Sequence, residues 1–154
     1  KPFEQLTVAI IGDIKHSRVA RSDIEALQTL GAREIRVIAP RTLLPRGIET
    51  FGVKVYNNMD EGVAGCDVLI ALRIQNERIG SPLLSSSEEF YRLYGLTEVR
   101  GARAAPGALV MHCLPAYRGK EIDDATFEAN AQTIFDQAEN RLHAQKAILA
   151  WAVG

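Results

Sequence analysis

The sequence predicts an α/β fold, in the form of a three-layer, Rossmann-like domain with a central, mainly parallel five-stranded sheet. Short runs rich in β-branched residues alternate along the chain with segments that have helical spacing of apolar residues. These short runs are largely apolar, with few charged residues among them, so we expect both faces of the sheet to be covered by helices. The chain has 154 residues, of which 47% are hydrophobic, and this size predicts a single domain over residues 1–154.

The first strand–helix–strand unit is the clearest part of this pattern. A strand is predicted at residues 6–11 and another at 34–39. Between them, residues 18–30 place apolar side chains on one stripe, and Gly31 supplies a stop. The members of this stripe are Val19, Ile24, Leu27 and Leu30.

The remaining elements follow the same alternation. Strands are predicted at residues 53–56, 67–71 and 108–111, and helices at 61–65, 88–94 and 137–153. The last helix is predicted to have an apolar face formed by Ala138, Leu142, Ala147, Ile148 and Trp151. Residues 79–87 are rich in Ser, Pro and Gly, which predicts a mobile loop.

Charge and composition exclude several classes of function. Eighteen Lys and Arg residues nearly balance nineteen Asp and Glu residues, so no overall field favours nucleic acid or a membrane surface as a partner. No apolar run reaches the length of a membrane span, and the two cysteines form neither a disulfide framework nor a metal motif, which favours the cytoplasm. The nucleotide-binding and metal-binding motifs G-x-G-x-x-G, Walker A and H-E-x-x-H are absent, so we expect no cofactor and no metal.

Arginines follow several of the predicted strands. Ligands of open parallel sheets bind beyond the carboxyl ends of the strands, where residues 12–18, 39–41, 72–78 and 112–118 are expected to meet. The first of these segments leads from a strand through Gly12 into a helix that begins near Arg18. Helix starts and arginine forks both favour anions, so a small anion is the expected ligand.

Arg73 and Gln75 directly follow the predicted strand at residues 67–71. A guanidinium group beside a neutral amide suits a carboxylate that lies next to a second polar group. The alternative interpretation is a solvated helix start, in which Glu77 and Arg78 balance each other.

The segment His112-Cys113-Leu114-Pro115 ends the last predicted strand. A proline at this place can hold an unusual turn and expose backbone carbonyls, and the Leu114–Pro115 bond is a candidate for the cis form. Cys113 is either a nucleophile or a partly buried structural thiol, and the residues alone favour the thiol. His112 is a candidate site residue or a histidine at the edge of the core.

Two families together account for these motifs. Residues 12–22 (GDIKHSRVARS), 38–45 (IAPRTLLP), 72–78 (LRIQNER) and 93–97 (LYGLT) resemble the aspartate-binding domain of bacterial aspartate carbamoyltransferases, with coverage of residues 3–110. Residues 111–154 are similar instead to the closing part of ornithine carbamoyltransferases, through MHCLPAYRG at 111–119 and FDQAENRLHAQK at 135–146. The two enzymes share a fold, so the resemblance implies one continuous sheet, whether in a natural fragment or in a chimera.

The resemblance to the aspartate enzymes implies roles for five residues. Arg18, Arg73 and Gln75 would hold the two carboxylates of aspartate. The backbone around Leu114 and Pro115 would orient the carbamoyl group.

The resemblance to the ornithine enzymes adds three candidate contacts. Cys113 would lie beside the ornithine amine, and Arg141 would reach carbamoyl phosphate, with His112 next to them. The Ser-Met-Gly loop of the ornithine enzymes is absent, and Leu72-Arg73-Ile74 stands in its place, which favours aspartate as the acceptor.

The function that the resemblance implies is the amino-acid-binding domain of a carbamoyltransferase, which forms N-carbamoyl-L-aspartate in pyrimidine biosynthesis. Ornithine specificity is one alternative, and a stand-alone α/β scaffold without activity is another. The N-terminal carbamoyl-phosphate domain of the family, with its Ser-Thr-Arg-Thr motif, has no counterpart in this sequence, so we expect little or no turnover from the chain alone. The family is trimeric, and an uncovered apolar face would favour self-association of the isolated domain.

Overall fold

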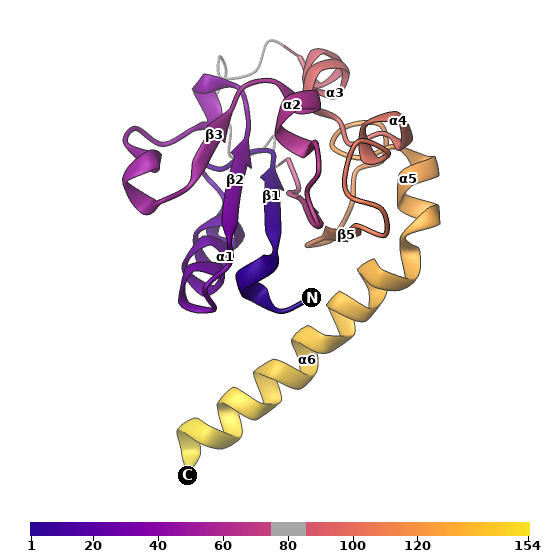
Figure 1. The fold of residues 1–154 in the computed structure, drawn as a ribbon. Helices are drawn as coiled ribbons and strands as arrows, with labels where there is room; N and C mark the ends of the chain where they lie inside the picture. Colours follow the sequence, from indigo (N-terminus) through magenta and orange to yellow (C-terminus); the bar gives the residue numbers. More distant parts are fainter. Residues whose placement is uncertain (75–85) are drawn as a thin grey trace.

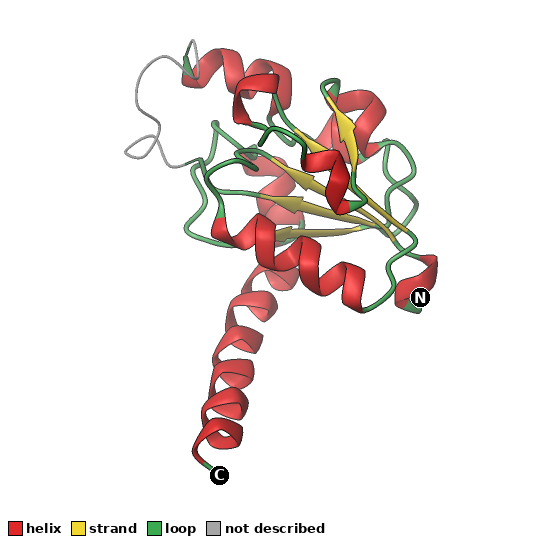
Figure 2. Ribbon diagram, turned by 90° about the vertical axis from the view of Figure 1, so that its left-hand side faces the viewer, coloured by secondary structure: helices red, strands yellow, loops and turns green. Residues whose placement is uncertain are grey.

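A five-stranded sheet with helices on both faces forms the centre of the computed structural model, which describes residues 1–74 and 86–154 (Figure 1). The strands lie in the order β3-β2-β1-β4-β5, and every neighbouring pair is parallel. Figure 2 shows the sheet between its covering helices. The predicted α/β class and parallel sheet are therefore confirmed. The strands are β1 (Thr7–Ile11), β2 (Glu34–Ile38), β3 (Lys54–Tyr56), β4 (Val68–Ala71) and β5 (Leu109–His112).

The central strands are buried on both faces. All residues of β1 and β4 are buried, as expected for continuous apolar runs in a parallel sheet. The predicted strand bounds differ from the observed ones by at most one residue at each end. The shift matters only at β5, which extends to His112 and so carries this side chain to the edge of the sheet.

Helix α1 (Arg18–Thr29) follows β1 and is capped by Ser17, whose hydroxyl accepts a hydrogen bond from the N–H of Ala20. Gly31, with φ of 74°, lies just beyond its end, as predicted. The predicted apolar stripe is only partly correct. Ile24 is buried against the sheet, whereas Val19 is 38% exposed because it lines a pocket described below.

Short helices complete the two faces. Asn58 caps α2 (Met59–Val63), so this helix begins two residues before the predicted start at residue 61. Ser86 caps α3 (Ser87–Tyr94). Five short elements were not predicted from the sequence, namely α4 (Glu98–Gly101), α5 (Asp124–Ala129) and the 3₁₀ turns η1 (Phe3–Gln5), η2 (Arg41–Leu43) and η3 (Ile48–Phe51).

The terminal helix α6 (Ala131–Val153) begins six residues before the predicted start at residue 137 and extends away from the domain (Figure 1). Near its start, Ile134 is buried and the helix packs against β5. Of the residues predicted to form its apolar face, Ala138 is half-buried at the pocket described below and the other four are exposed, including Trp151 at 86%. Within residues 1–74 and 86–154, no helix is long and apolar enough to cross a bilayer.

Candidate active site at the carboxyl edge of the sheet

The chain makes a sharp turn directly after β5. The Leu114–Pro115 peptide bond is cis, as the sequence analysis considered, and Leu114 has a positive φ of 50°. A left-handed conformation is unusual for a leucine, so the surrounding contacts must hold this backbone in place. The turn therefore directs its peptide groups in a way that an ordinary extended segment would not.

A buried pair of side chains holds this turn. Nδ1 of His112 accepts a hydrogen bond of 2.9 Å from the N–H of Leu114, so the ring proton of the neutral imidazole lies on Nε2. Nε2 lies 3.2 Å from Oε1 of Glu121 and donates to it. The same oxygen accepts a 2.7 Å hydrogen bond from the N–H of Tyr117. Glu121 therefore links the two ends of the turn through one carboxylate oxygen.

Cys113 lies in the turn and is half-buried. Burial raises the pKa of its thiol above the ordinary value, although hydrogen bonds from the backbone of Arg73 and from its own backbone act in the opposite direction. The carboxyl group of Asp23 on α1 also raises the thiol pKa, and burial raises the pKa of Asp23 itself to about 6. A raised pKa favours the neutral thiol over the thiolate, in agreement with the structural role preferred above.

Arg73 follows β4 and contacts Tyr117 from the neighbouring turn. Its Nη2 donates a 2.9 Å hydrogen bond to the hydroxyl of Tyr117, and its guanidinium carbon lies 5.0 Å from the centre of the ring. The ammonium group of Lys120 lies 5.0 Å from the same ring centre. Tyr117 thus brings two cations to the end of β4 by cation–π attraction.

The turn between β1 and α1 contributes the third part of this edge. Gly12 has a φ of 126°, and a Cβ at this position would lie 3.1 Å from Cβ of Leu72, so only glycine fits between the ends of β1 and β4. Buried Asp13 accepts a hydrogen bond from the N–H of His16 and also contacts its ring nitrogen. Arg18, the first residue of α1, is exposed.

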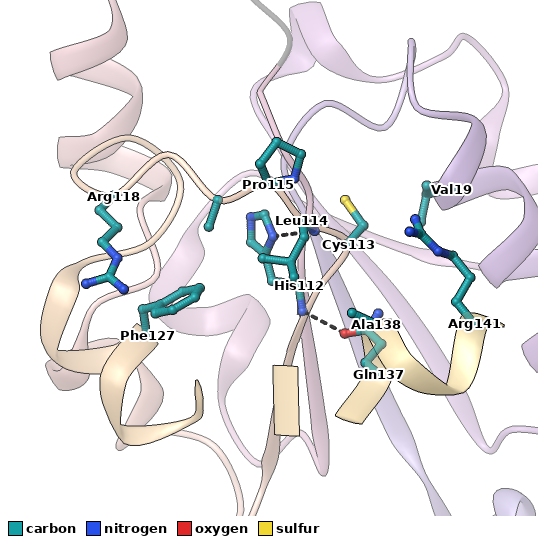
Figure 3. Close-up of a pocket in the computed structure, with 11 residues that line it drawn as sticks. Val19, His112, Cys113, Leu114, Pro115, Arg118, Phe127, Gln137, Ala138 and Arg141 are labelled. Carbon is teal, nitrogen blue, oxygen red and sulfur yellow. Dashed lines mark hydrogen bonds between the residues drawn. The ribbon is translucent and has the colours of Figure 1, made fainter. Parts of the chain in front are cut away.

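A pocket of about 740 Å³ opens beside the turn after β5 (Figure 3). In Figure 3, Cys113 lies on the same side of the turn as Val19 and Arg141, whereas Arg118 and Phe127 lie on the other side. Helix α6 is held at the pocket because the side-chain oxygen of Gln137 accepts a hydrogen bond from the N–H of His112. The lining residues are Val19, His112, Cys113, Leu114, Pro115, Ala116, Arg118, Phe127, Gln137, Ala138 and Arg141.

The comparison with protein families identifies this domain. The model described as "Aspartate/ornithine carbamoyltransferase, Asp/Orn binding domain" matches residues 4–152. The chain belongs to this family. The single match includes both the segment that resembles the aspartate enzymes and the segment that resembles the ornithine enzymes.

Solved ornithine carbamoyltransferases have the same fold. The enzyme of Gloeobacter violaceus is 29% identical to this chain with a TM-score of 0.77, and the match covers 94% of this chain and 50% of that one. The anabolic enzyme of Campylobacter jejuni is 27% identical with a TM-score of 0.79, covering 96% and 51%. The enzyme of Pyrococcus furiosus is 28% identical with a TM-score of 0.76, covering 95% and 49%. This carbamoyltransferase domain therefore spans about half the length of these matches.

Five of the predicted site residues line one pocket of the carbamoyltransferase domain, namely His112, Cys113, Leu114, Pro115 and Arg141. The convergence of Arg18, Arg73 and Gln75 stays a prediction. Arg18 and Arg73 follow the adjacent strands β1 and β4 but do not line the pocket, and Gln75 lies outside the described residues, as does most of the predicted mobile loop at 79–87.

Three residues that shape this edge were not predicted from the sequence, namely Asp23, Tyr117 and Glu121. Their contacts join positions that are far apart or separated by an irregular turn, and no motif spacing marks such pairs. Glu121 lies close in sequence to both of its partners, nine positions after His112 and four after Tyr117, but the irregular turn between them leaves no regular spacing to detect.

Proposed function

We propose that this chain is the acceptor-binding domain of a carbamoyltransferase, and that the pocket beside the cis Leu114–Pro115 turn is its side of the active site. One observation carries the proposal: the turn places His112, Cys113 and the Leu114 backbone in a single pocket together with Arg141. The pocket combines exposed arginine side chains, peptide groups in a fixed orientation and a neutral thiol. These groups suit orientation of a small charged substrate more than covalent catalysis.

The reaction proposed for the complete enzyme is attack of an acceptor amine on the carbamoyl carbon of carbamoyl phosphate. A carbon–nitrogen bond forms, the bond from that carbon to the phosphate oxygen breaks, and the amine loses a proton. Negative charge develops on the leaving phosphate, and a guanidinium group such as that of Arg141 stabilises it. We further propose that residues 1–154 form one domain, that Arg141 contributes part of the carbamoyl-phosphate site, and that a second domain must complete this site for turnover.

Ornithine is the acceptor that the comparisons support. The three solved structures named above are all ornithine carbamoyltransferases, and each has between 27% and 29% identity to this chain. Cys113 fits this proposal, because its neutral thiol accepts a hydrogen bond without adding charge beside a substrate amine. The carboxyl group of Asp23 acts electrostatically on the same thiol, and in this proposal its negative charge attracts the ammonium group of ornithine.

Aspartate is the second candidate, and a specific observation favours it. Arg73 and Lys120 both lie within about 5 Å of the Tyr117 ring, so two cations face the edge where an acceptor would bind. A dicarboxylate gains more from two cations than a substrate with a second amine does. In this second proposal Arg18, Arg73 and Gln75 hold the carboxylates.

Calorimetric titration of the purified chain with L-ornithine and L-aspartate, each with and without carbamoyl phosphate, tests both candidates. The proposal expects one of the amino acids to bind, and Cys113→Ala to weaken ornithine binding if ornithine is the acceptor. Arg141→Gln is expected to weaken binding of carbamoyl phosphate, whereas Arg46→Gln, which removes an exposed arginine from a loop outside the pocket, serves as the matched control. Absence of binding by both amino acids at millimolar concentration, alone and with carbamoyl phosphate, would contradict the proposed function.

A further inference from the structure

Tyr117 is the residue through which two parts of the site contact each other. Arg73 belongs to the segment that resembles the aspartate enzymes, and Tyr117 belongs to the segment that resembles the ornithine enzymes. The two residues are 44 positions apart in the chain, yet the hydroxyl of Tyr117 accepts a hydrogen bond from the guanidinium group at 2.9 Å. We propose that Tyr117 is a positioning residue that holds Arg73 for a carboxylate of the acceptor.

The geometry restricts the guanidinium group in two ways. The hydroxyl fixes the direction of one N–H edge, and the ring, whose centre lies 5.0 Å from the guanidinium carbon, attracts the positive charge through its π electrons. An arginine side chain otherwise has many rotamers, and ordering it costs free energy when a ligand binds. A guanidinium group that is already oriented binds a carboxylate more tightly because this cost has been met during folding.

The ring also allows two like charges to lie near each other. The ammonium nitrogen of Lys120 lies 5.0 Å from the ring centre, and each cation gains its own attraction to the ring. The result is a local positive potential at the end of β4, although the chain as a whole has a net charge of −1. Such a potential attracts a carboxylate and repels the amine of the same substrate, so it orients an amino acid as well as binding it.

A hydrogen bond to the buried side chain of Glu121 fixes the backbone of Tyr117. Its N–H donates a 2.7 Å hydrogen bond to Oε1 of Glu121, which is only 2% exposed. The same oxygen accepts from His112, whose ring holds the N–H of Leu114. The contacts therefore run continuously from the cis turn to Arg73, so the turn and the arginine are set by one buried carboxylate.

This inference rests on the proposed function, and two measurements separate them. The first is calorimetric binding of L-ornithine and L-aspartate to the chain and to Tyr117→Phe, which removes only the hydroxyl, and Tyr117→Leu, which removes the ring as well. Loss of one hydrogen bond predicts that Tyr117→Phe weakens binding of the accepted amino acid by about threefold to tenfold. Tyr117→Leu is expected to weaken binding of this amino acid further, until its affinity approaches that of the Arg73→Gln variant.

A matched control is available elsewhere in the chain. Tyr56 makes a similar contact with Arg36, with 5.2 Å between the guanidinium carbon and the ring centre, outside the residues that line the pocket. Tyr56→Leu should leave acceptor affinity unchanged. Wild-type affinity in both Tyr117 variants, or an equal loss in Tyr56→Leu, would overturn the inference while leaving the proposed function intact.

The second measurement needs no ligand. Nuclear magnetic resonance of the Arg73 side-chain Nε–H reports how well the guanidinium group is ordered, and we expect a dispersed signal in the chain that shifts toward the free arginine position in Tyr117→Leu. An unchanged Arg73 signal in that variant would overturn the positioning role even if neither amino acid binds. Absence of acceptor binding together with the expected shift would instead contradict the proposed function alone.

Discussion

Replacement of Glu121 tests whether one buried oxygen holds the turn after β5. Glu121→Leu keeps a similar volume but removes the acceptor for His112 and for the N–H of Tyr117, which lie 3.2 and 2.7 Å from Oε1. Each buried donor that loses its partner costs about 1–3 kcal/mol, so the variant should lose about 2–6 kcal/mol of unfolding free energy. That range is a large part of the stability of an ordinary domain, about 5–15 kcal/mol.

Glu121→Gln is the matched control for charge. Its amide oxygen can accept both hydrogen bonds, and its NH₂ group would occupy the place of Oε2, which is buried and has no hydrogen-bond partner. Since the buried charge is also removed, we expect a change within about 1 kcal/mol. Urea unfolding followed by far-ultraviolet circular dichroism gives the midpoint and slope for both variants. The reasoning would be refuted if Glu121→Leu lowered the free energy of unfolding no more than Glu121→Gln does.

Three further predictions concern pH and packing. Burial raises the pKa of Asp23 from 3.8 to about 6, so the folded protein holds this proton more tightly than the unfolded chain does. The free energy of unfolding should therefore decrease as the pH is raised from about 4 to about 6. Asp23→Asn should abolish this fall in a series of thermal melts. In α2, Gly62→Ala should cost about 1–3 kcal/mol because its Cβ would lie 2.5 Å from a strand side chain, whereas Gly101→Ala, which faces open space, should stabilise by up to about 1 kcal/mol in urea unfolding. On α6, Ile134→Ala should cost about 2–5 kcal/mol and Trp151→Ala less than about 0.5, because only Ile134 is buried; equal losses would contradict this view of the helix.

The elements that sequence reasoning predicted well are those whose signal is local. All five predicted strands are present, and the continuous apolar runs of β1 and β4 lie buried at the centre of the sheet, while α1 ends where Gly31 adopts a positive φ. Helix α5 was missed although a local signal existed, since Asp123 accepts a hydrogen bond from the N–H of Thr126 as a helix cap. Its six residues are too few for an apolar period to be visible.

The exposed half of α6 shows the limit of periodicity. Leu142, Ile148 and Trp151 were predicted to lie on one apolar face of a helix, and the helix exists. However, at about 100° per residue Leu142 and Trp151, which are nine positions apart, lie on opposite sides of it. These apolar residues are spread around the helix and give no information on what covers them, and in this structure all three side chains are more than half exposed. The site has the same limit, because the contact between Arg73 and Tyr117 depends on the arrangement of two strands and not on any spacing within one segment.

The register of the sheet explains why residues from two different resemblances form one site. Ala71 at the end of β4 pairs with His112 at the end of β5, so the next residues of both strands leave the sheet side by side. Cys113 then meets the backbone of Arg73. A slip of one residue between β4 and β5 would turn the Cys113 thiol to the opposite face and separate it from Arg73. The buried pairs between these two strands therefore select the register and, through it, the relative positions of the thiol, the cis turn and the arginine.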